Sequence, residues 1–158
     1  MRSDSIKQIG LISDTHGLLR PQALAALRGC DAIVHAGDIG DPEILRRLGD
    51  VAPTRAVRGN NDRGAWAMSI PLRETIEVGG YRLYVLHDLS ELDIDPATEQ
   101  FAAVISGHSH KPRAEQRDGV LYLNPGSAGP RRFRLPIVLA KLYVRRDKLE
   151  HELIELSV

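Results

Sequence analysis

Seven residues with nitrogen or oxygen donors lie in short polar motifs between positions 14 and 110. The motifs are Asp-Thr-His, Gly-Asp, Gly-Asn-Asn-Asp, His-Asp and Gly-His-Ser-His, and they supply Asp14, His16, Asp38, Asn60, His87, His108 and His110. Imidazole and carboxylate donors without a thiolate suit manganese, iron, cobalt, nickel or zinc, whereas calcium prefers oxygen ligands alone. One such ion rarely takes seven protein ligands, so the set predicts two divalent ions that share a carboxylate. Two ions so placed can acidify a water between them and clamp the oxygens of a phosphoryl group.

Each motif is weak evidence by itself. Asp, Thr, Asn and Gly are all common in turns. His108 and His110 would project to the same side of an extended segment, yet such pairs also occur on ordinary surfaces. The combination carries the argument, because four of the six histidines fall in these motifs, interleaved with Asp14, Asp38 and Asn60.

The chain before residue 61 alternates short apolar strands with short helices. The pattern predicts strands at 6–13, 32–35 and 54–57 and a helix at 21–28. A second helix is predicted to be capped by Asp41, to begin at Pro42 and to end at Gly49. This βαβαβ order implies parallel strands with right-handed crossovers, and open α/β sheets place their sites beyond the carboxyl ends of such strands. Each polar motif follows a predicted strand, so we expect the donors to converge on one crevice.

From residue 69 onward the pattern changes to hairpins. Strands at 73–78 and 81–87 alternate across Gly79-Gly80, which is a good two-residue turn. A short helix after Asp95-Pro96 and a strand at 102–106 are predicted next, followed by hairpins that turn at 118–119 and 146–148. We expect one α/β domain over residues 1–158, with a parallel first half, a largely antiparallel second half, and helices outside two packed sheets.

Composition narrows the class of protein. Hydrophobic residues make up 42% and charged residues 27% of the 158 residues, which is ordinary globular composition. Lys+Arg and Asp+Glu balance at 21 each, which argues against a broad nucleic-acid-binding surface. The single cysteine, Cys30, excludes an internal disulfide. With neither a long apolar stretch nor a signal-like beginning at Met1, we expect no membrane association and a cytoplasmic location.

The ordered motifs resemble those of the calcineurin-like metallophosphoesterase superfamily. Val-His-Ala-Gly-Asp at 34–38 and Asn-Pro-Gly-Ser at 124–127 are similar to its small prokaryotic, YfcE-type phosphodiesterase branch. The resemblance extends from Ile9 to Ser127. It implies the metallophosphoesterase fold, a four-layer α/β/β/α sandwich of two mixed sheets flanked by helices.

The resemblance also implies a division of the donors. Asp14, His16 and His110 would hold the first metal ion, Asn60, His87 and His108 the second, and Asp38 would bridge them. A hydroxide between the ions would attack a small phosphodiester bound across both. Manganese is the first expectation for both ions, with nickel, iron, cobalt or zinc as alternatives, and Asp38, Asn60 and Asn61 are the catalytic candidates.

Two positions depart from the family pattern. The wider superfamily carries a histidine at the position of Asn61, thought to contact the scissile phosphate or to protonate the leaving group. Asn61 cannot donate a proton at neutral pH, so activated leaving groups should be preferred. Asp62 is expected to orient an imidazole at that position. Asp88 replaces a common glycine, and we favour a turn cap over a partner for an imidazole.

The remaining histidines and arginines have simpler interpretations. We expect His35 to be a hydrogen-bonded core residue and His151 to lie on the surface. Arg58 and Arg63 flank the Gly-Asn-Asn-Asp motif, and three more arginines lie at 131–134. We expect these arginines to be solvated and place none of them in the site.

Two alternatives to a phosphodiesterase stay open. One is a protein-interaction scaffold on the same fold, as in the eukaryotic retromer subunit that resembles this family. The complete donor set favours the enzyme over this scaffold. The other is a phosphomonoesterase or protein phosphatase, which Asn61 and the shortness of the loops disfavour. A homodimer through the exposed hairpins also stays open.

Overall fold

The computed structural model describes residues 7–158. Its first sheet combines the first three strands of the chain with the last two strands. Strands β1 (Lys7–Ile12), β2 (Ala32–His35) and β3 (Thr54–Ala56) are parallel, while β9 (Val138–Val144) and β10 (Leu149–Glu155) run antiparallel beside β1. The order is β10-β9-β1-β2-β3. Residues 1–6, which include the predicted first residue of β1 and the beginning weighed as a signal segment, lie outside the described residues.

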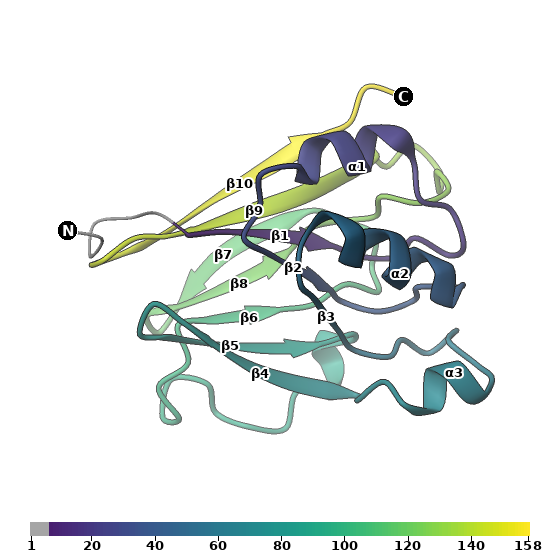
Figure 1. The fold of residues 1–158 in the computed structure, drawn as a ribbon. Helices are drawn as coiled ribbons and strands as arrows, with labels where there is room; N and C mark the ends of the chain where they lie inside the picture. The colour runs from purple at the N-terminus through teal and green to yellow at the C-terminus, as the bar shows by residue number, and fades with distance from the viewer. Residues whose placement is uncertain (1–6) are drawn as a thin grey trace.

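The second sheet packs face to face on the first (Figure 1). It contains β4 (Arg73–Val78), β5 (Tyr81–Leu86), β6 (Ala103–Ile105), β7 (Arg113–Arg117) and β8 (Val120–Asn124), in the order β4-β5-β6-β8-β7. The pairs β5–β6 and β6–β8 are parallel, so the expectation of a largely antiparallel second half is only partly right. The reason is that the connections at 87–102 and 106–119 are each long enough to return the chain in the same direction.

Two helices cover the outer face of the first sheet. They are α1 (Pro21–Leu27) and α2 (Pro42–Val51), and the Asp41 side chain caps α2 by accepting a hydrogen bond from the Glu43 amide at 2.9 Å. The predicted end at Gly49 is wrong, because α2 continues for two more residues. A mid-helix glycine costs about 1 kcal/mol, and the burial of Ile44 and Leu48 against the sheet outweighs that cost.

The outer face of the second sheet has a thinner cover. The helix predicted after Asp95-Pro96 is wrong, since residues 96–100 form turns. Phe101, which follows these turns, packs against Tyr84 on the sheet. The 3₁₀ helix η2 (Leu89–Glu91) lies just before them. A further short helix, α3 (Ala65–Met68), sits where the chain passes from β3 to β4. The four-layer sandwich of two mixed sheets is confirmed, with an outermost layer made of η2 and turns.

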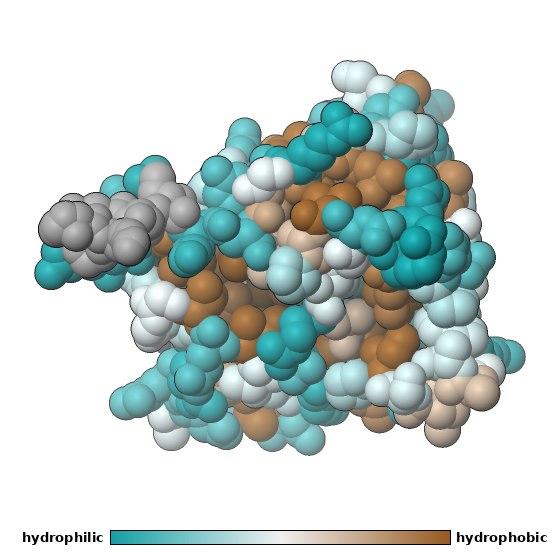
Figure 2. All heavy atoms as spheres, viewed as in Figure 1, coloured by the Kyte–Doolittle hydropathy of each residue, from teal (hydrophilic) through white to brown (hydrophobic). Residues whose placement is uncertain are grey.

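The core lies in two main places. One cluster fills the space between the sheets and includes Leu83 and Ile105, and a second lies between the first sheet and helices α1 and α2. Figure 2 shows hydrophilic residues over the outer side of α2 and hydrophobic residues beside and beneath it. Among residues 7–158, none of the helices has the length and apolar character needed to cross a membrane.

The ends of several strands meet at one side of the sandwich. The arrowheads of β1, β2, β5 and β6 point the same way in Figure 1. The loops that follow them therefore emerge at one edge. The predicted strands that carry them agree with the observed ones to within one residue at either end.

Candidate metal centre

The loops that carry the predicted ligands hold an unusual backbone conformation. In the described part of the chain, eight non-glycine residues have positive φ, and five of them are predicted ligands: Asp14, His16, Asp38, His108 and His110. Each such residue costs of the order of 1 kcal/mol, and strain of this kind clusters at functional sites. The sequence gives no clear sign of it, because aspartate and histidine take this conformation more often than most residues but still only in a small fraction of cases.

Glycines allow these loops to approach one another closely. A Cβ on Gly59 would lie 2.2 Å from Asp38 Oδ1, and a Cβ on Gly107 would lie 2.0 Å from Ser13 Oγ and 2.7 Å from Asp14 Oδ2. Both contacts are with the carboxylates or their hydrogen-bond partners. Only glycine fits at these two positions.

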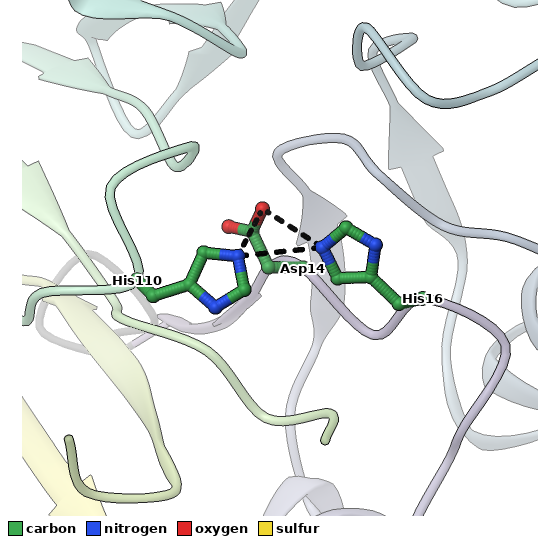
Figure 3. Close-up of side chains that lie close together, drawn as sticks. All are labelled: Asp14, His16 and His110. Atoms are coloured by element: carbon green, nitrogen blue, oxygen red, sulfur yellow. Dashed lines mark hydrogen bonds and ion pairs between the residues drawn. The ribbon is translucent and has the colours of Figure 1, made fainter. Parts of the chain in front are cut away.

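The first group of donors is formed by Asp14 and His16 after β1 and His110 after β6. Figure 3 shows their side chains facing one another. His16 Nε2 lies 3.3 Å from His110 Nε2 and 3.7 Å from Asp14 Oδ1, and His110 Nε2 lies 3.5 Å from the same oxygen. Donors on adjacent positions of one tetrahedral ion, with bonds of about 2.0–2.2 Å, lie about 3.3–3.6 Å apart. This triangle is close to that size.

Hydrogen bonds to the second oxygen of Asp14, Oδ2, orient its carboxylate. Asp14 Oδ2 accepts hydrogen bonds from Ser13 Oγ at 2.7 Å and from the His108 amide at 3.0 Å. These two bonds leave Oδ1 facing the histidines.

The second group is formed by Asp38 after β2 and by His87 and His108 from the second sheet. His87 Nδ1 lies 2.7 Å from the carbonyl oxygen of Ala36, which can only accept, so Nδ1 carries the proton and Nε2 offers a lone pair. His87 Nε2 lies 3.2 Å from Asp38 Oδ2 without hydrogen-bond geometry. Two acceptors at this distance repel each other, and a cation between them would remove the repulsion.

Asp38 lies between the two groups. Its Oδ2 is 3.2 Å from His87 Nε2 in the second group and 3.6 Å from His16 Nε2 in the first. Asn60 joins the second group, because its Oδ1 lies 3.2 Å from His108 Nδ1. The structure thus brings all seven predicted donors together.

The donor atoms suit a cation because several of them are buried and unsatisfied. Within residues 7–158, Asp14 Oδ1, His87 Nε2 and His110 Nδ1 are buried without a hydrogen-bond partner. An unsatisfied buried polar atom costs about 1–3 kcal/mol, so such atoms call for an explanation. Two of the three face the space between the groups, and a cation bound there would satisfy both.

Electrostatics keep both carboxylates ionised. Burial alone would raise the pKa of Asp14, but the contacts with His16 and His87 outweigh it and hold the pKa below its usual value. The pKa of Asp38 lies well below its usual range, because His87 and the Asn61 amide outweigh the effect of burial. Negative charge therefore faces the histidines at neutral pH, as a cation site requires.

Asn61 and Asp62 take roles that the sequence does not predict. The Asn61 amide donates to Asp38 Oδ1 at 2.9 Å, and its side-chain Nδ2 donates to Oδ2 at 3.1 Å. Asn61 thereby fixes the plane of the Asp38 carboxylate. Asp62 accepts hydrogen bonds from the amides of Gly40 and Gly59 at 2.9 and 2.8 Å. Its carboxylate fastens two loops together, and its expected role as the partner of an imidazole at position 61 stays a prediction.

His35 is the buried core residue that the sequence predicts. It is fully buried, its Nδ1 accepts from the Gly37 amide at 3.1 Å, and its Nε2 lies 3.0 Å from Thr15 Oγ1. Thr15 Oγ1 donates to the Ile39 carbonyl, so it accepts from His35 Nε2–H. Burial lowers the pKa of His35 to about 4, and the ring stays neutral. His151 is exposed on β10, as expected.

Two cavities adjoin the second group and share His108 and Asp88. One, of about 420 Å³, is lined by Arg58 together with Asn60 and His87. The expectation that no arginine lies at the site is therefore wrong for Arg58. The other, of about 240 Å³, extends away from the donors over β7 and β8.

Asp88 combines the two roles considered for it. It caps η2 by accepting hydrogen bonds from Ser90, as we favoured, and its Oδ2 also lies 3.7 Å from His108 Nε2. Burial acts to raise the pKa of Asp88, but the hydrogen bonds from Ser90 outweigh it and lower the pKa. Asp88 is therefore ionised and does not replace the missing proton donor.

Comparison with protein families agrees with the geometry. The model of the calcineurin-like phosphoesterase superfamily domain matches residues 8–147. The chain belongs to this superfamily. The superfamily comprises metal-dependent phosphoesterases, which agrees with the two groups of candidate ligands.

Individual relatives point the same way. The chain is 34% identical to a probable metallophosphoesterase of Methanothermobacter thermautotrophicus, over 92% of this chain and 91% of that protein. It is 30% identical to phosphodiesterase YfcE of Escherichia coli K12, over 73% of this chain and 76% of that protein. Wild-type Vps29 of Entamoeba histolytica complexed with Zn²⁺ has the same fold, with a TM-score of 0.73 and 20% identity over 95% of this chain and 99% of that one.

Proposed function

We propose that this phosphoesterase hydrolyses phosphodiesters with two divalent transition-metal ions, manganese first among the candidates. The observation that carries the proposal is the pair of donor groups that meet at Asp38. Asp14, His16 and His110 would hold one ion, His87, His108 and Asn60 the other, and Asp38 both. Ions bound there would polarise the phosphoryl group and lower the pKa of a water.

The chain's own residues would chiefly position the reacting groups. Asn61 holds the Asp38 carboxylate through two hydrogen bonds and leaves its remaining lone pairs free. Arg58 lines the larger cavity beside Asn60 and His87, and its Nε is buried without a hydrogen-bond partner among the described residues. A guanidinium there would neutralise charge on a phosphoryl oxygen.

Two features bear on the choice of substrate, one on the leaving group and one on the number of ester arms. Neither Asn61 nor the ionised Asp88 can protonate a leaving group, so poor leaving groups are disfavoured. The two cavities that share His108 and Asp88 also offer separate space for the two ester arms of a diester. A monoester has only one arm and would leave one cavity unused.

A scaffold function is the second candidate, because Vps29 of Entamoeba histolytica shares the fold and is complexed with Zn²⁺. Metal binding alone does not distinguish the two functions, whereas measured hydrolysis of a phosphodiester does. The complete donor set and the two adjoining cavities favour the enzyme.

The test begins with metal-stripped protein reconstituted with Mn²⁺. We expect two ions per chain by elemental analysis, and hydrolysis of bis(p-nitrophenyl) phosphate at least tenfold faster than that of p-nitrophenyl phosphate. Asp38→Ala should abolish hydrolysis, because it removes the shared ligand. His151→Ala, which removes an exposed histidine far from the site in sequence, is the matched control and should behave like wild type.

Three outcomes contradict the proposal. A single ion per chain overturns the dinuclear centre. Faster turnover of the monoester overturns the diester preference. Two bound ions with no hydrolysis of either ester favour the scaffold.

A further inference from the structure

The smaller of the two cavities is lined by cations and an aromatic ring. Lys111, Arg113 and Arg117 line it together with Tyr122 on β8. Because the cavity also includes His108, it begins at the second donor group and leads away from it. A substrate whose phosphoryl group lies at the candidate metal centre would therefore extend one arm into this cavity.

The positive charge in this cavity is only partly neutralised. Glu115 forms ion pairs with both Arg113 and Arg117, so one carboxylate faces two guanidinium groups. Lys111 has no side-chain partner in the described part of the chain. Among residues 7–158, Asp88 is the only acid that lines the cavity, at the end next to His108. The far end of the cavity therefore carries excess positive charge and suits an anion.

The same cavity offers a flat surface. The guanidinium carbon of Arg117 lies 4.3 Å from the centroid of the Tyr122 ring. Stacked arginine and tyrosine are a good surface for a planar aromatic group. Leu89 and Leu123 supply apolar walls. At about 240 Å³ the cavity is smaller than the about 300–1,000 Å³ of sites that enclose a whole ligand, which fits one arm of a substrate.

We infer that this cavity binds a nucleotide arm, an aromatic base that carries a phosphate in addition to the scissile one. The inference rests on the proposed function, since it places that arm next to the phosphodiester at the metal centre. Tyr122 and Arg117 would take the base, and Lys111 and Arg113 the additional phosphate. The balanced net charge of the chain favours a small nucleotide diester over a long nucleic-acid strand.

The kinetic test uses two diadenylates that differ only in a terminal 5′-phosphate. For the Mn²⁺-loaded wild type, we expect kcat/KM to be about tenfold or more higher for the phosphorylated form, as a hydrogen-bonded charge pair would give. Arg113→Ala and Lys111→Ala should reduce this ratio toward one, because these two side chains would hold the additional phosphate. Arg82→Ala is the matched control, because Arg82 lies 4.2 Å over the Phe101 ring on the same sheet but does not line this cavity. It should leave the ratio unchanged.

A binding test gives a second readout that does not depend on turnover. In calorimetric titrations without added metal, adenosine 5′-monophosphate should bind more tightly than adenosine or inorganic phosphate, and Arg117→Ala should weaken it about tenfold. Equal binding of inorganic phosphate, or an unchanged constant in Arg117→Ala, overturns the nucleotide site. A rate that keeps rising with strand length overturns the small-substrate form.

Failure of the inference and failure of the proposed function are distinguishable. If bis(p-nitrophenyl) phosphate is hydrolysed but the two diadenylates react equally, only the nucleotide arm is wrong. If bis(p-nitrophenyl) phosphate is not hydrolysed, the proposed function is wrong, and loss of nucleotide binding in Arg117→Ala still supports the cavity as a nucleotide site.

Discussion

Asn61 occupies the position where the wider superfamily carries a histidine, and it donates two hydrogen bonds to Asp38. A histidine there could protonate a leaving group but would give up the side-chain bond to Asp38. Asp62, the carboxylate expected to orient such an imidazole, already accepts hydrogen bonds from the amides of Gly40 and Gly59. The identity of this one residue thus links proton donation to the geometry of the carboxylate that we propose as the shared ligand.

Replacing Asn61 should separate these two effects. Asn61→His should raise the rate for alkyl diesters relative to aryl diesters, by no more than about 10²-fold, which is the low end of general acid catalysis. Asn61→Ala should lower both rates about tenfold, since a hydrogen bond to a charged group contributes about 1.5 kcal/mol. Both rates are measured at saturating Mn²⁺. An equal change for both substrates in Asn61→His would mean that the position acts only through Asp38.

At the scale of elements, His35 connects the two loops that carry Asp14 and Asp38. Its ring nitrogens bond Gly37 in the loop after β2 and Thr15 in the loop after β1. Both bonds require the neutral ring with its proton on Nε2. The position of Asp14 relative to Asp38 therefore depends on an uncharged histidine.

This dependence predicts a specific loss of stability in acid. The pKa of His35 is about 4 in the folded chain, against 6.5 ordinarily, so between these values the unfolded chain binds the extra proton. Its contribution is fully present above pH 6.5 and is lost as the pH falls toward 4. Between pH 7 and 4.5 the free energy of unfolding of metal-free wild type should fall by about 2–3 kcal/mol more than that of His35→Gln.

Urea denaturation at the two pH values measures this difference, with His151→Ala as a control that keeps the wild-type slope. If His35→Gln loses as much stability as wild type between the two pH values, the ring is not the titrating group.

Local sequence signals predict the elements well and their partners poorly. The strand at 32–35, the cap at Asp41 and the turn at Gly79-Gly80 are all confirmed, because each depends on a few adjacent residues. The pairing of β9 with β1 and of β6 with β8 depends on how long connections cross the sheets, which no local pattern encodes. The predicted helix end at Gly49 is wrong for a related reason, since the packing of α2 on the sheet outweighs the low helix propensity of glycine.

The same division applies to the site. Residue types and spacing predict the seven donors, because metal chemistry restricts them to a few side chains at strand ends. Sequence does not predict the contacts that depend on three-dimensional approach, such as Arg58 in the larger cavity or Asn61 on Asp38. Positive φ at the ligands is equally hidden, because it is imposed by loops that must converge.

At the scale of the whole molecule, each donor group spans both sheets. Asp14 and His16 come from the first sheet and His110 from the second, while Asp38 comes from the first and His87 and His108 from the second. The site exists only when the two sheets are packed. An ion bound there therefore connects the two halves of the sandwich and binds the folded chain alone.

Metal should accordingly stabilise the fold in a way that depends on which ligand is present. An ion at about 100 times its Kd adds about 2.7 kcal/mol, and about 2–4 °C per kcal/mol for a chain of this size gives about 5–10 °C in Tm for each ion. His110→Ala should lose about half of the total shift, because it removes a ligand of the first ion only. Asp38→Ala should lose nearly all of it, because both ions share that carboxylate in the proposed centre, whereas His151→Ala should keep the full shift. Differential scanning calorimetry with and without Mn²⁺ measures these shifts, and a chelator should reverse them.

Equal losses in His110→Ala and Asp38→Ala would mean that Asp38 serves one ion, and the shared-ligand arrangement would be wrong.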